Sequence, residues 1–196
     1  MIYFITVLAY LVGSIPFGFI IAWLVGAGDI RGQGSGNIGA TNVMRSVGKL
    51  PGLMTFLLDF LKGTLVVVLA HHFAGDTAAV CAAVAAVVGH SYPIFLKFKG
   101  GKSVAVGAGV FMAISPKAVL AVLLIFALVA LTTRIVSAAS LTASAAFPPI
   151  AWLLGSPIPA VWAGVLVVVV IFIRHGANIR RLIRGEEPTF RLKKDR

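Results

Sequence analysis

Three polar segments interrupt an otherwise apolar chain, and the first of them has the composition of a phosphate-binding loop. It runs from Gly32 to Arg45 and holds four glycines within eight residues, so its peptide N–H groups can approach a ligand closely. Arg45 adds a guanidinium whose planar fork suits phosphate oxygens. A helix beginning near residue 40 would also favour an anion at its N-terminus. We expect a phosphate-binding loop here, with an ordinary flexible loop as the alternative.

The second polar segment, Gly89 to Ser103, ends in Gly-Gly-Lys-Ser at the start of an apolar run. This ending resembles part of a nucleotide-binding P-loop, but the full pattern needs a glycine six positions before the lysine, where Leu96 stands. A carboxylate for magnesium is also missing, since no acidic residue lies between Asp76 and Glu186. Nucleotide hydrolysis is therefore disfavoured, whereas glycines, a lysine and a helix N-terminus still predict a phosphate site.

The third polar segment, Arg174 to Arg181, contains the residues best suited to handle a proton. His175 and Asn178 are three positions apart, so in a helix they lie on one face. Histidine exchanges a proton near neutral pH. The arginines of this segment can equally anchor the chain at anionic lipid. That role requires neither His175 nor Asn178, and we expect these two residues to line a reacting centre.

The composition defines the kind of molecule that must position these segments. The 196 residues are 59 % hydrophobic and 12 % charged, with a mean hydropathy of +1.01. Average soluble domains are roughly 45–50 % apolar and about 25 % charged. A chain this short cannot bury so much apolar surface, which excludes a soluble globular protein, and the composition also excludes disorder. The net charge of +11 then indicates anionic lipid or a phosphorylated substrate, and we expect no nucleic acid partner.

Apolar runs define the expected helices. Charges and turn residues separate seven runs, at 1–28, 51–73, 77–96, 103–115, 118–133, 135–154 and 158–173. Strands are disfavoured because membrane barrels alternate polar and apolar residues, which Val165–Ile173 does not. No basic residue precedes the first run, so we interpret it as a retained helix rather than a signal peptide. Gly13, Pro16 and Gly18 predict a kink in it.

These runs predict an all-α integral membrane protein of about seven short transmembrane helices, forming a single multi-pass membrane domain over residues 1–196. Six helices remain the alternative, because the 103–115 segment is short enough to be re-entrant. With seven alternating spans, fifteen of the seventeen basic residues fall on one side. The positive-inside rule then places the N-terminus outside, and the C-terminus with all three polar segments in the cytoplasm. The basic residues from Lys193 to Arg196 are expected to serve topology and lipid contact.

The three segments together resemble the signature motifs of one family. They read Ser35-Gly-Asn-Ile-Gly-Ala-Thr-Asn42 followed by Arg45, Gly-Gly-Lys102-Ser103, and His175-Gly-Ala-Asn178. The chain is similar, over essentially its whole length, to the bacterial acyl-phosphate:glycerol-3-phosphate acyltransferases (the PlsY family). The resemblance implies a cytoplasmic (inner) membrane enzyme with seven helices and its active site on the cytoplasmic face. It would transfer a fatty acyl group to the 1-hydroxyl of glycerol 3-phosphate, giving lysophosphatidic acid in the first acylation step of phospholipid biosynthesis.

The resemblance also implies the ligands of this enzyme. The expected substrates are glycerol 3-phosphate and acyl phosphate, with neither acyl-CoA nor acyl carrier protein as donor. Membrane lipid is the expected surrounding, and a soluble acyl-phosphate-producing enzyme is a candidate partner. No cofactor and no metal are expected. A transporter for a small phosphorylated anion is the main rival hypothesis, although transporters usually gather polar contacts near the midplane of the bilayer.

Residue roles carried over from the family are expectations as well. We expect His175, Asn178 and Ser140 in catalysis and Ser35, Arg45, Lys102 and Ser103 at the substrate phosphate. We expect the following residues to shape the loops: Gly36, Asn37, Gly39, Thr41, Asn42, Gly100 and Gly101. Two acceptors of the hydroxyl proton remain open, His175 and the substrate's own phosphate, and the phosphate is preferred.

Two further features are expected to have no catalytic role. Asp59 and Lys62 can pair structurally on one helical face, and the His-x4-Asp pattern of His71 and Asp76 falls on the outer side.

Overall fold

The computed structural model describes residues 1–190, so the predicted role of Lys193 to Arg196 lies outside the described residues. Within 1–190 the chain is helical and contains no β-strand, as expected. The elements are α1 (Ile2–Gly13), α2 (Phe17–Leu24), η1 (Ile30–Gly32), α3 (Ala40–Ser46), α4 (Lys49–Ser91), η2 (Ile94–Leu96), α5 (Val104–Ile114), α6 (Pro116–Thr133), α7 (Val136–Leu153), α8 (Ile158–Arg174) and α9 (Gly176–Ile183).

The first apolar run is broken where its sequence predicts a kink. Pro16 lies between α1 and α2 and supplies no backbone N–H, so the helical hydrogen-bond ladder stops there. The carbonyl of Ile15 accepts only a 3.2 Å bond from the N–H of Phe17 and is left open to another donor. The break turns α2 toward the first polar segment.

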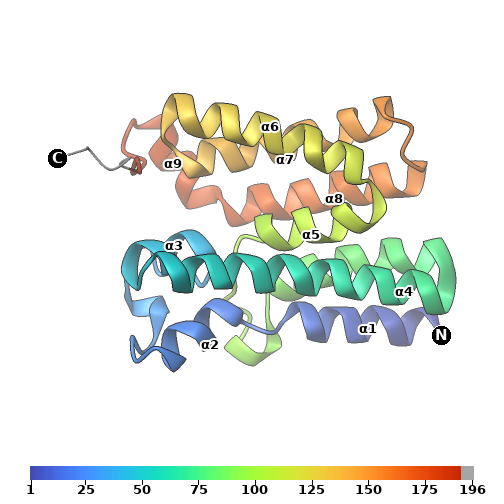
Figure 1. Ribbon diagram of the computed structural model, residues 1–196, viewed down its shortest axis with the longest axis horizontal. Helices are drawn as coiled ribbons and strands as arrows, with labels where there is room; N and C mark the ends of the chain where they lie inside the picture. The colour runs from blue at the N-terminus through green and yellow to red at the C-terminus, as the bar shows by residue number, and fades with distance from the viewer. Residues whose placement is uncertain (191–196) are drawn as a thin grey trace.

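Helix α4 folds back on itself at Gly75, which has φ 74° and ψ −170°. A straight helix would separate Asp59 from His90 by about 46 Å, yet the Asp59 carboxylate lies 3.5 Å from His90 Nδ1. The boundary predicted between the runs 51–73 and 77–96 is therefore a sharp turn at Gly75. The two apolar runs on either side of it form antiparallel arms that lie side by side (Figure 1).

Helix α5 has 11 residues and is about 16 Å long, roughly half of a bilayer's hydrocarbon thickness. It begins within the bundle, after the loop of the second polar segment, and runs to the end where α4 folds back (Figure 1). Within residues 1–190, four helical segments are long and apolar enough to cross a membrane, or five if the bent pair α8–α9 is one span.

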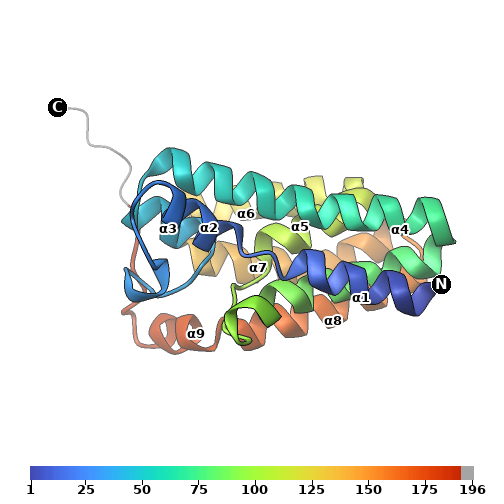
Figure 2. The same ribbon diagram turned by 90° about the horizontal axis from the view of Figure 1, so that it is seen from below.

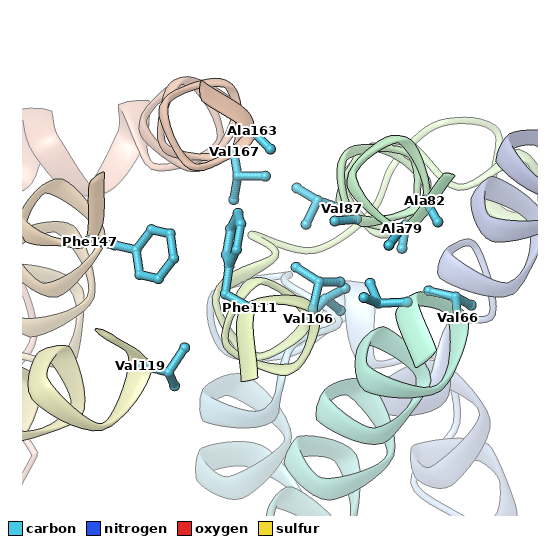
Figure 3. Packing of buried hydrophobic residues seen from close by; sticks show 14 of the residues in the cluster. Val66, Ala79, Ala82, Val87, Val106, Phe111, Val119, Phe147, Ala163 and Val167 are labelled. Atoms are coloured by element: carbon cyan, nitrogen blue, oxygen red, sulfur yellow. The ribbon is translucent and has the colours of Figure 1, made fainter. Parts of the chain in front are cut away.

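The bundle core lies where α4, α5, α6, α7 and α8 meet (Figure 3). Phe111 of α5 packs against Phe147 of α7 with ring centroids 4.2 Å apart. At other contacts, a glycine allows the backbones of two helices to approach each other closely. A Cβ on Gly13 would overlap the backbone of Ala86, and one on Gly109 would overlap the carbonyl of Phe60. The outer surface is rich in exposed leucine, valine and phenylalanine side chains, as lipid contact requires.

One end of the bundle carries the helices that adjoin or contain the first and third polar segments. Both views place α2, α3 and α9 at this end, with the start of α1 and the fold-back of α4 at the other (Figures 1 and 2). The chain thus starts at one end of the bundle, and its last helix lies at the other.

Candidate active site

A polar pocket lies at the end that carries α3 and α9, and all three polar segments contribute to it. Its lining residues are Asp29, Arg31, Ser35, Gly36, Asn37, Phe98, Lys99, Gly100, Lys102, Arg174, Ala177, Asn178 and Arg181. Six of the residues predicted from the sequence are among them: Ser35, Gly36, Asn37, Gly100, Lys102 and Asn178. Residues as far apart in sequence as Asp29 and Arg181 are thus brought to one cavity.

Lys102 is the central cation of this pocket. Its ammonium donates to the amide oxygen of Asn178 at 2.5 Å, which joins the second polar segment to the third. Burial lowers the pKa of Lys102 to about 8. Glu187 opposes this shift, while the positive charges of Arg181, Arg174 and Arg45 add to it. A phosphate dianion entering the pocket would relieve the repulsion among these cations, so the site is electrostatically prepared for an anion.

The side chain of Asn42 holds the first polar segment together through hydrogen bonds to its backbone. Its side chain is buried, and its amide oxygen accepts a 2.8 Å hydrogen bond from the N–H of Ser35. Its amide nitrogen donates to the carbonyls of Asn37 and Gln33 at 2.8 and 3.0 Å. One side chain therefore holds three points of the glycine-rich loop and sets the position of Ser35 at the pocket.

The glycine turn of the second segment is held in a strained loop. Lys97, Phe98 and Ser103 have left-handed backbone angles, with φ of 52°, 63° and 59°. Non-glycine residues adopt such angles at a cost of about 1–3 kcal/mol each, and they persist where surrounding contacts enforce them. Arg174 supplies such contacts, because its guanidinium donates to the carbonyls of Gly100 and Gly101 at 2.7 and 3.0 Å.

Those contacts give Arg174 a role that the sequence did not single out. We expected the arginines of the third segment either to anchor the chain at lipid or to serve the ligand. Arg174 instead binds the backbone of the second segment and stacks on Tyr92, with the guanidinium carbon 5.1 Å from the ring centroid. It keeps both glycine carbonyls turned toward itself, so they do not face an anion.

His175 lies at the break between α8 and α9, which bend by 65° relative to each other. It is buried, and its Nδ1 lies 2.8 Å from the carbonyl oxygen of Ile171. A carbonyl only accepts, so we assign the proton of the neutral ring to Nδ1. Nε2 then carries the lone pair, which is available to a hydroxyl proton.

Glu187 joins the hydrogen-bonded cluster of Lys102 and Asn178, and it was not predicted from the sequence. Its carboxylate accepts hydrogen bonds from Asn178 at 2.5 Å, from Ser137 at 2.7 Å and from Arg181 at 2.7 Å. Burial opposes its ionisation, but these three hydrogen bonds hold the pKa of Glu187 below its usual value. No motif or spacing marked it, because it follows the end of α9 in a charged tail.

Other predicted residues are not brought to the pocket wall. The hydroxyl of Ser103 donates to the carbonyl of Val87 at 2.8 Å and contacts Ser91, which directs it into the helix packing. The hydroxyl of Ser140 donates to the carbonyl of Val136. Gly101 lies behind the turn, against His90. Arg45 and Thr41 are exposed on α3, and the N–H of Gly39 donates to the side-chain oxygen of Asn37.

The His-x4-Asp pattern is far from this pocket. His71 and Asp76 pair at 3.0 Å with both side chains largely exposed, at the fold-back of α4. Figure 1 shows that the fold-back lies at the opposite end of the bundle from α3 and α9. The pair is thus separate from all three polar segments, as expected.

An apolar pocket begins close to the polar one. It is formed by α5, α6, α7 and α8, and its walls include Val104, Gly107, Phe111, Phe147 and Ile171. Val104 follows the glycine turn directly, and Ile171 is the residue whose carbonyl holds His175. The walls of the two pockets come close along α8, where Ile171 lines the apolar pocket and Arg174 lines the polar one.

Comparison with known proteins agrees with this arrangement. A family model described as glycerol-3-phosphate acyltransferase matches residues 3–185. The chain is 43 % identical over 191 residues to the glycerol-3-phosphate acyltransferase of Syntrophotalea carbinolica, covering 96 % of this chain and 97 % of that protein. It is 48 % identical over 194 residues to that of Hyphomonas neptunium, covering 96 % and 92 %.

Two solved structures share the fold. Both are crystal structures of PlsY (YgiH), an integral membrane glycerol 3-phosphate acyltransferase. The glycerol 3-phosphate form superposes with a TM-score of 0.93 at 41 % identity, covering 97 % of this chain and 96 % of that one. The lysophosphatidic acid form gives 0.91 at 40 % identity, with 97 % and 95 % covered.

Proposed function

The chain belongs to the glycerol-3-phosphate acyltransferase family, and from that membership we propose that it transfers a fatty acyl group from acyl phosphate to the 1-hydroxyl of glycerol 3-phosphate. The products are lysophosphatidic acid and inorganic phosphate, and the step is the first acylation of phospholipid biosynthesis. The observation that carries this proposal is the proximity of a cationic pocket and an apolar pocket, whose walls include Arg174 and Ile171 of the same helix. Glycerol 3-phosphate suits the first pocket, and a fatty acyl chain suits the second.

For this reaction the protein mainly has to position the two substrates and stabilise the negative charge of the departing phosphate. The hydroxyl oxygen bonds to the acyl carbon, the bond from that carbon to the phosphate oxygen breaks, and the hydroxyl proton leaves. Acyl phosphate is already activated, so stabilising the departing phosphate matters more than a strong acid. Lys102 and Arg45 supply positive charge, and Ser35 supplies a neutral donor. Lys102, Arg45 and Ser35 are our proposed phosphate ligands, whereas Ser103, whose hydroxyl donates to the Val87 carbonyl, is not among them.

The proton has two possible acceptors, and we favour the phosphate of the substrate. His175 Nε2 is the alternative base, since its Nδ1 is occupied by the Ile171 carbonyl. Among residues 1–190, no carboxylate lies within hydrogen-bond distance of His175, whose ring is bonded to the Ile171 carbonyl. The carboxylate that usually strengthens a histidine base is therefore missing from this part of the chain. In our proposal His175, Asn178 and Ser140 orient the glycerol hydroxyl at the reacting carbon.

The placement of the enzyme in the membrane is part of the proposal. We propose one multi-pass domain with seven helices crossing or entering the bacterial inner membrane, the N-terminus outside and the active site at the cytoplasmic face. Two features support this topology: the positions of the start of α1 and of α9 at opposite ends of the bundle, and the excess of basic residues at the α9 end. A transporter is disfavoured, because the polar pocket lies at one end rather than at the midplane.

A direct assay tests the donor and the acceptor together. Purified protein in detergent micelles is given glycerol 3-phosphate with palmitoyl phosphate, palmitoyl-CoA or palmitoyl acyl carrier protein, and lysophosphatidic acid is measured by mass spectrometry. We expect product from palmitoyl phosphate alone, without added metal or cofactor, and far less product from a Lys102→Met variant at low glycerol 3-phosphate. Product from palmitoyl-CoA alone would refute the proposed donor. Uptake of glycerol 3-phosphate into proteoliposomes without product would favour the transporter.

A further inference from the structure

A buried charged network lies directly behind the glycine turn of the second polar segment, outside the polar pocket. It consists of Asp59 and Lys62 on the first arm of α4 and His90 at the end of the second arm. The three residues are only 2–4 % exposed. Lys62 Nζ lies 2.7 Å from the Asp59 carboxylate and 3.0 Å from His90 Nδ1. Two ions in the low-dielectric interior of a membrane protein are costly, and neither is used by the chemistry described above.

Lys62 connects this network to the first polar segment. Besides its bonds to Asp59 and His90, its ammonium donates to the carbonyl of Ile15 at 2.7 Å. That carbonyl lies at the break between α1 and α2, directly before Pro16. Lys62 also lies over the ring of Phe17, the first residue of α2, at 5.4 Å from the ring centroid. It therefore fixes the helix that leads into the loop holding Ser35.

His90 connects the same network to the glycine turn. Its carbonyl accepts a 2.9 Å hydrogen bond from the N–H of Gly101. Its imidazole packs so closely on Gly101 that a Cβ there would overlap Nε2. An ammonium can only donate, so Nδ1 accepts from Lys62 and the neutral ring carries its proton on Nε2, on the side of the turn. The Lys62 bond thus fixes the orientation of the ring on which Gly101 lies.

We propose that Asp59, Lys62 and His90 are positioning residues that hold the glycine turn and the first polar segment in register for binding the phosphate of glycerol 3-phosphate. This inference rests on the proposed function. Lys62 is the shared point, since it bonds at once to the α1–α2 break and to the ring beneath Gly101. Asp59 balances the charge of Lys62, which allows an ammonium to stay buried there. Arg174 holds the other side of the turn through the two glycine carbonyls.

The test replaces the ion pair without leaving an unpaired charge. The double variant Asp59→Asn/Lys62→Met keeps the approximate volume, whereas either single change leaves one buried ion alone and is strongly destabilising. The matched control is Thr64→Val on the same arm of α4, which removes a cross-helix hydrogen bond to the Gly109 carbonyl but does not contact His90. Thermal unfolding in micelles establishes that each variant is folded.

We expect the double variant to raise KM for glycerol 3-phosphate roughly tenfold or more while KM for palmitoyl phosphate changes less than about twofold. We expect Thr64→Val to leave both KM values near those of the wild type. A second variant, His90→Asn, keeps an oxygen near the position of Nδ1 for Lys62 but removes the ring beneath Gly101. His90→Asn should raise KM for glycerol 3-phosphate in the same way, with little loss of thermal stability. If the double variant does not fold, this variant tests the positioning role instead.

Two readouts separate this inference from the proposed function. Calorimetry measures binding of glycerol 3-phosphate without any acyl donor, and hydrogen–deuterium exchange follows residues 97–103 and 30–42 without turnover. We expect weaker binding and faster exchange confined to those two segments. Binding equal to that of Thr64→Val, or exchange that rises uniformly along the chain, would overturn the positioning role. A wild type that binds glycerol 3-phosphate but makes no lysophosphatidic acid would refute the donor and leave the network open to these same measurements.

Discussion

The ammonium of Lys102 and the side-chain amide of Asn178 lie 2.5 Å apart, although 76 positions separate them in the sequence. Asn178 uses its oxygen for Lys102 and its nitrogen for Glu187, so it forms a polar bridge between a cation and an anion. This bridge joins the glycine turn to α9 and holds the Lys102 ammonium at the polar pocket.

Replacing Lys102 by methionine should weaken binding of glycerol 3-phosphate while preserving the fold. A hydrogen bond to a charged group contributes about 1.5–3 kcal/mol, which corresponds to an increase in KM of roughly tenfold to a hundredfold. Steady-state kinetics at saturating palmitoyl phosphate measures it. Lys97→Met is the control, because Lys97 is exposed and does not line the pocket. A KM for glycerol 3-phosphate that is equal in the two variants would contradict the role of Lys102.

The activity should depend on pH in the way expected when a buried lysine must be charged. Because the pKa of Lys102 is lowered to about 8, its charge is present below that pH and is lost as the pH rises through it. The value of kcat/KM for glycerol 3-phosphate should therefore fall above about pH 8. An ordinary lysine would keep its charge to about pH 10. In the variant Lys102→Arg the charge persists, so the alkaline fall should move out of the measured range. A profile that is flat to pH 9.5 in the wild type would contradict this assignment.

Glu187 should stabilise the protein in a pH-dependent manner. Its pKa is held below the usual 4.5, so the ionised carboxylate stabilises the fold above about pH 4.5, and the contribution is lost as the pH falls through the folded-state value. We expect Glu187→Gln to lower Tm at pH 7, with the difference from the wild type shrinking toward pH 3.5. Thermal unfolding across this range measures it. Glu186→Gln, at the exposed neighbouring position, should have little effect at any pH.

The variant His175→Ala distinguishes the two proton acceptors. If the substrate phosphate takes the proton, His175 only orients the hydroxyl, and its loss should lower kcat by roughly tenfold to a hundredfold, less than the loss of an essential base. Single-turnover kinetics together with calorimetric binding of glycerol 3-phosphate measures the two effects separately. Near-total loss of turnover with unchanged affinity would instead make His175 the base.

The apolar pocket should determine which acyl chains are accepted. A Cβ on Gly107 would lie at ordinary contact distance from Val167 and Ile171, at 3.6 and 3.7 Å, so a side chain can be added without a collision. We expect Gly107→Leu to fill the pocket and to lower turnover of palmitoyl phosphate more than that of octanoyl phosphate. Leu124→Phe on the exposed face of α6 is the control. Equal losses for both chain lengths would place the acyl chain elsewhere.

The sequence predicted the helices well because their signals are local. Apolar runs between glycine, proline and charge set the ends of α6, α7 and α8 to within a few residues, and Pro16 and Gly75 marked the two breaks. The Asp59–Lys62 pair is also confirmed, since residues three apart share a helical face and two ions in an apolar setting pair.

The contacts that complete the site depend on tertiary structure and left no local signal. Glu187 reaches Asn178 only because the chain turns back after α9. The direction of the Ser103 hydroxyl follows from a left-handed backbone angle that its residue type does not favour. His90 approaches Lys62 only because α4 folds back, and Arg174 meets the glycine carbonyls because α8 ends beside them.

The glycine contacts between helices have a consequence for how this protein tolerates mutation. In lipid, an exposed leucine exchanged for another aliphatic residue meets much the same surroundings before and after the change. At Gly13 or Gly109 a single added methyl group would strike the backbone of the neighbouring helix. Those helices lead to the turn and the loop that we propose to bind the phosphate of the substrate. Substitutions should therefore be most harmful at the glycines where helices touch. Substitutions of the large side chains that face lipid should be tolerated best.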